Sequence, residues 1–216
     1  MSKEIKTEGQ AQQEPEVEQT KRAHVIVLKK PHTWEQKEFQ EIDLGGLDQL
    51  TIQDAIEAQR DLFGQQEVAS SLLCETTTAF AMEIAAKASG LPIEFFKMLP
   101  INVGRQVKRD VQEYIRKSDG QDDGVLRLKK PYYFDGKQYT EFDLSPIADM
   151  SVMQESAAEN VMAREGFIIT ENTFNYLYAC VIASMAVNKK KELFTGLPLS
   201  ELLNLKEAVN NSDFFE

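Results

Sequence analysis

The apolar and polar residues of this chain alternate with two periods, and this arrangement occurs twice. Residues 25–28 form a short apolar run, and residues 37–44 alternate as in a β-strand with one buried face. Residues 125–128 and 137–144 repeat the arrangement, and Asp135-Gly136 between them is typical of a tight hairpin turn. Apolar residues at helical spacing follow in both halves. The pattern predicts an α+β, mostly helical protein in which each half is a β-hairpin followed by three or four helices.

The two halves are related by duplication at an offset of one hundred residues. Between residues 25–51 and 125–151, 9 of 27 positions are identical without a gap, whereas chance gives roughly one or two. The identical residues are Val25, Leu28, Lys29, Lys30, Pro31, Lys37, Glu41, Asp43 and Leu44, with their partners one hundred positions later. Because stacked repeats cover each other's apolar faces, the two modules are expected to pack as a pseudo-symmetric pair.

Two helices are predicted after each hairpin. Thr51 with Asp54, and Ser151 with Gln154, form capping-box patterns that place a helix start at each site. Apolar residues of the second helix share one face, and these are Leu73, Phe80, Ile84 and Leu91 in the first copy and Phe174, Leu177, Tyr178, Val181, Ile182 and Met185 in the second.

Both copies then reach a Gly-Leu-Pro tripeptide, at residues 90–92 and 196–198, which predicts a helix end followed by a helix start. Taking the tripeptides as equivalent places about eight additional residues in the second copy. It also gives the first copy a last helix that the second lacks or shortens. The apolar face of that helix contains Val103, Val107, Val111, Tyr114 and Ile115.

Composition sets the boundaries and excludes some partners. Residues 1–23 are expected to be a disordered arm, 24–118 the first module, 119–124 a linker and 125–216 the second module. The longest apolar run, Tyr176–Val187, has 12 residues, fewer than the ~20 that span a bilayer. The N-terminus lacks the apolar core of a secretory signal, so a cytoplasmic location is expected. A net charge of −11 argues against nucleic acid and anionic membranes as partners.

The sequence contains no recognisable catalytic, cofactor or metal motif. A phosphate-binding loop, HExxH, GxSxG and CxxC are all missing from it. Cys74 and Cys180 are interpreted as core residues, and His24 and His32 lack ligand spacing to either. The repeated Lys-Lys-Pro at residues 29–31 and 129–131 fits both a partner contact and a charged guard of an exposed strand edge, and the choice stays open. We therefore expect no enzyme activity and no cofactor.

One segment of the second copy carries a resemblance. Residues 136–144 read Gly-Lys-Gln-Tyr-Thr-Glu-Phe-Asp-Leu, between a Lys-Pro strand and a later Gly-Leu-Pro turn. This pattern resembles the tail assembly chaperones of long-tailed bacteriophages. The first copy departs from it at Gln36, Phe39 and Gln40. The resemblance implies a non-enzymatic protein of the host cytoplasm, absent from the mature virion. It would keep the tape-measure protein soluble and help to recruit subunits of the major tail (tube) protein.

Two surfaces are candidates for partner binding. A helix-binding groove is expected between the long helices, around Phe80, Tyr176 and Tyr178. The basic face formed by Arg105, Lys108 and Arg109 is the other candidate, either as a grip on the acidic second copy, whose charge from Asp119 onward is 9 − 16 = −7, or simply as a solvated face. A structural component of the tail or connector is the alternative function, and an enzyme or nucleic-acid regulator has less support. The sequence leaves self-association open.

Overall fold

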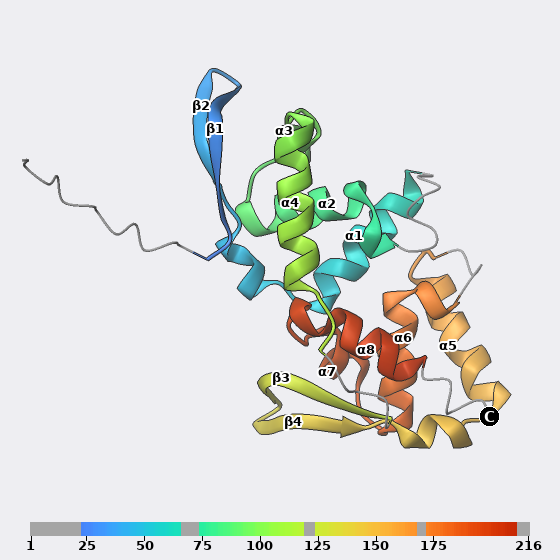
Figure 1. The fold of residues 1–216 in the computed structure, drawn as a ribbon. Coiled ribbons are helices and arrows are strands. Elements are labelled where there is room, and N and C mark those ends of the chain that lie inside the picture. The colour runs from blue at the N-terminus through green and yellow to red at the C-terminus, as the bar shows by residue number, and fades with distance from the viewer. Residues whose placement is uncertain (1–22, 66–73, 119–123, 168–171, 211–216) are drawn as a thin grey trace, which may run out of the picture.

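The computed structural model describes residues 23–65, 74–118, 124–167 and 172–210. Within these residues the protein is α+β, with two antiparallel β-hairpins and eight α-helices (Figure 1). Apart from Ala23 and Gly124, the predicted arm and linker lie outside the described residues, as does Leu73. None of the described helices is long and apolar enough to cross a membrane.

The same order of elements occurs in both modules. The first contains β1 (Val25–Trp34), β2 (Lys37–Asp43), η1 (Gly45–Gln49), α1 (Ile52–Gly64), η3 (Cys74–Thr76), α2 (Thr78–Ser89), α3 (Ile93–Lys97) and α4 (Ile101–Tyr114). The second contains β3 (Val125–Phe134), β4 (Lys137–Asp143), η4 (Ser145–Asp149), α5 (Val152–Arg164), η5 (Asn172–Phe174), α6 (Tyr176–Ala186), α7 (Lys191–Thr195), η6 (Leu199–Glu201) and α8 (Leu202–Val209), where η denotes a short 3-10 helix.

The element order corrects the predicted alignment of the two Gly-Leu-Pro tripeptides. From η3 onward, each element of the first module recurs 98 residues later, since α2 begins at Thr78 and α6 at Tyr176. Leu99-Pro100 therefore corresponds to Leu197-Pro198, and both prolines precede the last helical segment with similar backbone angles (φ −55°, ψ 141° and φ −51°, ψ 142°). The second copy consequently has no insertion of eight residues there, and its last helix is shortened instead of missing.

The hairpins form as the sequence predicts, with one difference at their turns. Asp135 and Gly136 both have positive φ, 46° and 74°, as the favoured two-residue hairpin turn requires. The first hairpin places Glu35 and Gln36 at the equivalent positions, with φ of 44° and 67°. Both strand ladders are irregular between their third and eighth residues. Each Lys-Lys-Pro sequence lies at this irregularity, where proline costs no ladder hydrogen bond.

Capping boxes begin α1 and α5, as predicted. The Asp54 carboxylate accepts a hydrogen bond from the backbone N–H of Thr51 at 2.9 Å, and the Gln154 side-chain oxygen accepts one from Ser151 at 2.9 Å. These bonds satisfy backbone donors that a helix start leaves free. Leu50, Thr51, Met150 and Ser151 are all extended, so each helix is entered from a short straight segment.

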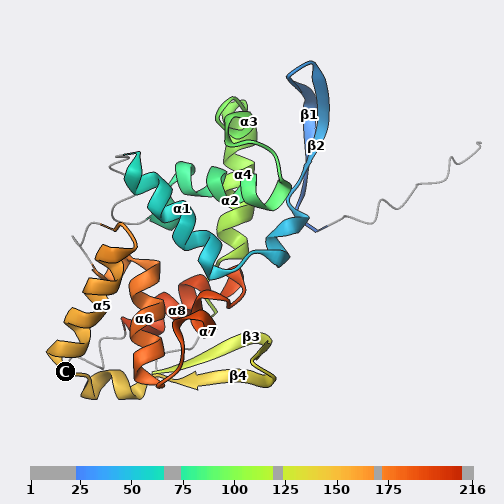
Figure 2. The same ribbon diagram turned by 180° about the vertical axis from the view of Figure 1, so that it is seen from behind.

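The two modules share one hydrophobic core, in which unequal surfaces meet. Helix α1 of the first module contacts α6, α7 and η6 of the second, as both views show in the middle of the molecule (Figures 1 and 2). A two-fold arrangement would pair α5 with α2 in the same way, but α5 contacts mainly α6 of its own module. The expected pseudo-symmetric packing is thus not confirmed. The contact is heterologous, meaning that each module contributes a different surface.

Candidate functional site

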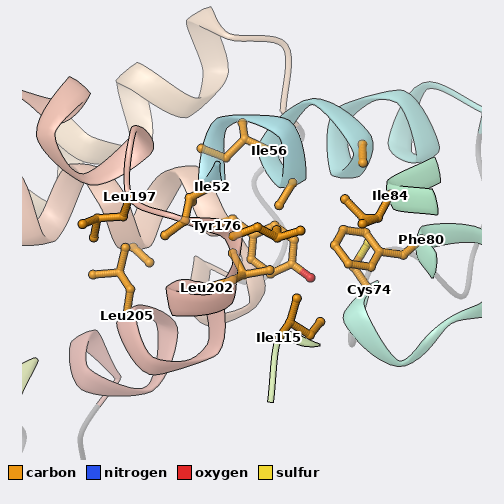
Figure 3. Packing of buried hydrophobic residues seen from close by; sticks show 14 of the residues in the cluster. Ile52, Ile56, Cys74, Phe80, Ile84, Ile115, Tyr176, Leu197, Leu202 and Leu205 are labelled. Atoms are coloured by element: carbon orange, nitrogen blue, oxygen red, sulfur yellow. The ribbon is translucent and has the colours of Figure 1, made fainter. Parts of the chain in front are cut away.

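The predicted aromatic residues lie in the core between the modules. Phe80 and Tyr176 are 0% and 1% exposed, and their rings contact each other with centroids 5.7 Å apart. Figure 3 shows Tyr176 surrounded by residues of α1, of η3 and α2, and of α8. Burial raises the pKa of Tyr176 well above its usual value, so its hydroxyl stays protonated. A partner helix therefore cannot reach Phe80 or Tyr176 while the modules are packed together.

Tyr178 is also largely buried, but it faces a different neighbour. Its hydroxyl contacts the Glu155 carboxylate of α5 at 3.3 Å, and burial together with this charge raises the pKa of Tyr178 to about 12. Tyr178 is 8% exposed, and it lines a hollow beside the start of α5. The three aromatic residues that the sequence placed around one groove are therefore divided between the core and this hollow.

The three basic residues on α4 face two different surfaces. Arg105 lies on the rim of a groove of the first module, whereas Arg109 lines a separate hollow with Asp110 and His24 beside the first hairpin. Lys108 is half-buried between them. Within the described part of the chain, none of the three basic residues forms an ion pair with the second module. The contacts of Lys117 with Glu207 and of Lys206 with Glu75 link the modules instead.

The groove beside Arg105 is a concavity of the first module that combines apolar and charged side chains. It encloses about 660 Å³ between the end of α1, α2, α3 and the start of α4. Its apolar surface consists of Leu62, Met82, Ile93, Phe96, Leu99 and Ile101. Glu83, Lys97 and Arg105 provide charges at the rim, and Ile101 is 72% exposed. An apolar floor with a charged rim is typical of a surface that receives a partner helix.

The second module shows what the equivalent surface binds. Leu197 and Leu199, the counterparts of Leu99 and Ile101, are 0% exposed because α1 covers them. The Ile52 N–H donates to the Leu197 carbonyl at 2.9 Å, and the Leu199 N–H donates to the Leu50 carbonyl at 2.9 Å. A helix and the extended residues before it therefore fill this surface in the second module.

The first-module surface is hollow because it has smaller side chains than the second module at two equivalent positions. Thr78 and Gly104 occupy the positions at which the second module has the large buried side chains Tyr176 and Leu202. A Cβ atom at Gly104 would meet nothing within 4 Å, so space is left above it. The Leu99 carbonyl and the Ile101 N–H form no hydrogen bond to any described residue, which leaves one acceptor and one donor at the groove edge.

The described metal-binding and nucleophilic side chains are dispersed or buried. Among the described residues, no group of three or more His, Cys, Asp or Glu side chains could hold a metal ion. Burial raises the pKa of the Cys74 thiol to about 12 and that of Cys180 further, so neither thiol is a ready nucleophile at neutral pH. The one described histidine–carboxylate pair, His24 with Asp110 at 3.3 Å, lies beside the first hairpin and away from the groove.

Sequence analysis missed Leu99 and Ile101 because it aligned the wrong prolines. Leu-Pro occurs at residues 99–100 as well as at 197–198, and this second repeat was the available signal. Comparison of the chain with protein-family models, with curated proteins and with solved structures found no match, so the groove is interpreted from its geometry.

Proposed function

We propose that this protein is a non-enzymatic tail assembly chaperone of a long-tailed bacteriophage. In this proposal it acts in the host cytoplasm, holds a helix of the tape-measure protein and helps to recruit tail-tube subunits around it. The observation that carries the proposal is the first-module groove, since the equivalent surface of the second module binds an amphipathic helix, α1. The motif at residues 136–144 and the net charge of −11, which favours solubility of a complex with an apolar partner, support it.

The structure of α1 indicates the kind of helix that suits such a groove. Its buried side chains Ile52, Ala55 and Ile56 are spaced three and four residues apart, and an extended residue, Thr51, precedes it. A cargo helix with small and branched apolar residues at this spacing would place them on Leu99, Ile101 and Phe96. The residue before the helix would pair with the free backbone groups at the groove edge.

Co-expression with the tape-measure protein encoded in the same genome tests the proposal. The wild-type chain should keep that protein soluble and co-elute with it in size-exclusion chromatography. Ile101→Asp should abolish co-elution, because it places a charge on the exposed apolar side chain at the groove edge, where Ile101 is 72% exposed. Met153→Asp is the matched control, since Met153 is 79% exposed and lies outside the groove. Co-elution with the Ile101→Asp variant would exclude this groove as the cargo site.

The location of the protein separates the chaperone from a structural role. A chaperone should be missing from purified virions, whereas a tail or connector component should be present in them at fixed stoichiometry. Mass spectrometry of purified particles therefore decides between the two functions. An insoluble tape-measure protein in co-expression, together with this chain in the virion, would overturn the proposal in favour of a structural role.

A further inference from the structure

A second hollow lies on the second module, beside the N-terminus of α5. It encloses about 390 Å³, and its lining includes Ile147, Met150, Val152, Asn172, Tyr178 and Ile182. The counterparts of these residues in the first module are Leu47, Leu50, Ile52, Cys74, Phe80 and Ile84, all but Leu50 fully buried. Figure 3 shows four of them in the core between the modules. The second module therefore carries the counterpart of the surface with which the first module binds its neighbour. Val152 is its exposed residue, whereas Ile147, Tyr178 and Ile182 are 7%, 8% and 4% exposed.

At both outer surfaces, a residue that is buried in the intramolecular contact has an exposed counterpart in the other module. Ile52 is 0% exposed where it meets Leu197 and Leu199, but its counterpart Val152 is 79% exposed. Likewise Leu199 is 0% exposed, and its counterpart Ile101 is 72% exposed. The intramolecular contact has two halves, the start of α1 around Ile52 and the surface around Leu197 and Leu199. Each half has an unoccupied counterpart on the other module, around Val152 and around Ile101.

The backbone at both vacant halves is already in the shape that the intramolecular contact uses. Ser151 is extended, as Thr51 is where it pairs with Pro198. The Val152 N–H and the Met150 carbonyl form no hydrogen bond to any described residue. The side-chain oxygen of Asn172, inside the hollow, is also buried without a partner in the described chain. Each of these groups gains from a second surface that supplies the missing donor or acceptor.

The two outer surfaces carry charged residues at positions that are uncharged in the intramolecular contact, and the two surfaces have opposite sign. Helix α5 has Glu155 and Glu159 where α1 has Ala55 and Gln59. The groove has Lys97, Arg105 and Glu83 at the positions of Thr195, Leu203 and Val181, so its rim carries a net charge of +1. Negative charge on one half and positive charge on the other favour their pairing. The same charges oppose contact of either half with another copy of itself.

We propose that a second copy of this chain docks the segment Met150–Val152 against Leu99–Ile101 of the first module, head to tail. The Val152 N–H then donates to the Leu99 carbonyl, and the Ile101 N–H donates to the Met150 carbonyl, as Ile52 and Leu199 do within one chain. Because the contact is heterologous, each added copy presents the next vacant half. This inference shares only the groove with the proposed function. A cargo helix and a second copy exclude each other there.

The contact between copies is weaker than the contact within the chain. Within one molecule the second module contributes the large side chains Tyr176 and Leu202 to the contact, whereas the outer groove offers only Thr78 and Gly104 at these positions. Less apolar surface is therefore buried per contact. Self-association is consequently reversible and depends on concentration, which allows a cargo helix to displace the second copy.

Sedimentation velocity of the full-length chain tests the proposal. The wild-type sedimentation coefficient should rise as the concentration increases from about 5 to about 500 µM, corresponding to a Kd in the micromolar range. Ile101→Asp and Val152→Asp should each remain monomeric, because each removes one half of the contact. An equimolar mixture of the two variants should form a 1:1 dimer and nothing larger, since it contains one intact pair of halves. Met153→Asp should associate like wild type, because the counterpart of Met153, Gln53, stays exposed in the filled contact.

Each result supports or overturns the proposal once circular dichroism has shown that the variants are folded. A wild-type chain that stays monomeric throughout, or a mixture that forms no dimer, overturns it. Co-expression with the tape-measure protein separates this inference from the proposed function, because Val152→Asp leaves the groove intact and Ile101→Asp does not. Cargo binding without self-association overturns only the head-to-tail contact. Self-association without cargo binding overturns only the chaperone.

Discussion

The hydroxyl of Tyr176 donates a hydrogen bond to Oε2 of Glu75 at 2.8 Å, across the boundary between the two modules. Glu75 is 8% exposed, and its other oxygen contacts the Nζ of Lys206 of the second module. A buried carboxylate is stable only when donors surround it. This pair therefore fixes the position of the second module on the first at the place where Tyr176 also packs on Phe80.

Tyr176→Phe should destabilise the protein without changing its fold. The ring and its packing are retained, but the buried Glu75 carboxylate loses one donor, which costs about 1–3 kcal/mol. Urea unfolding followed by circular dichroism measures the change in the free energy of unfolding. Tyr133→Phe is the control, because Tyr133 is 68% exposed and its hydroxyl should contribute little. Equal stability of the Tyr176→Phe variant and wild type would show that the hydrogen bond contributes nothing to the joining of the modules.

Gln36→Gly should stabilise the first hairpin. Gln36 has a φ of 67°, whereas the equivalent residue of the second hairpin is Gly136, with a φ of 74°. A side chain in this left-handed region costs roughly 1–2 kcal/mol, and the greater freedom of glycine in the unfolded chain offsets part of the gain. We expect a net increase of about 0.5–1 kcal/mol in the free energy of unfolding. The reverse change, Gly136→Gln, should lower stability by a similar amount, and equal signs for the two variants would contradict the argument.

Gly46→Ala and Gly104→Ala should have opposite effects on thermal stability. A Cβ at Gly46 would lie 2.0 Å from the carbonyl oxygen of Ala88, so η1 and α2 would have to separate. Overpacking of this kind costs about 1–3 kcal/mol or more. A Cβ at Gly104 meets nothing within 4 Å, and alanine inside a helix gains roughly 0.5–1 kcal/mol over glycine. Differential scanning calorimetry of both variants measures the two shifts, and a higher Tm for Gly46→Ala would contradict the close approach.

The buried thiols should be unreactive in the folded protein, and stability should fall at alkaline pH. Burial raises the pKa of Cys74 from 9.0 to about 12, so the folded state disfavours the thiolate. The resulting stabilisation is fully present below about pH 9 and is lost as the pH rises towards 12. We expect a thiol reagent at pH 8 to modify Cys74 and Cys180 only after denaturation. Cys74→Ala should reduce the loss of stability between pH 9 and 11, and rapid labelling of the native chain would refute the burial.

The hairpins and the first helix of each module followed from local sequence signals. Asp135-Gly136 and the Thr51–Asp54 and Ser151–Gln154 pairs act through neighbouring backbone groups, so they operate in the same way whatever surrounds them. The correspondence of the later elements did not follow, because the spacing between α1 and η3 differs by two residues from that between α5 and η5. Beyond that point the comparison without a gap fails, and a short identical tripeptide was misleading.

The contact between the modules could not be predicted from periodicity, because apolar spacing shows which face of a helix is buried but does not identify what buries it. A comparison of α1 with α5 contained the missing information. Ile56 of α1 corresponds to Ser156 of α5, and Ala55 corresponds to Glu155. Helix α1 thus has apolar residues on a second face, which the other module covers, whereas α5 has replaced most of that face with polar residues.

The unequal meeting of the two modules also bears on how such a chain can arise by gene duplication. A protein of one module would carry both halves of the contact and would meet its neighbours only as separate molecules. Joining two modules in one polypeptide raises their mutual effective concentration to about the millimolar range, so one contact becomes permanent. The second copy, with Tyr176 and Leu202, has the large side chains that suit a permanent contact, whereas Thr78 and Gly104 in the first copy suit one that forms and breaks. In such a history, divergence after duplication gives one copy of the surface a permanent contact within the chain and leaves the other copy free for a contact that forms and breaks.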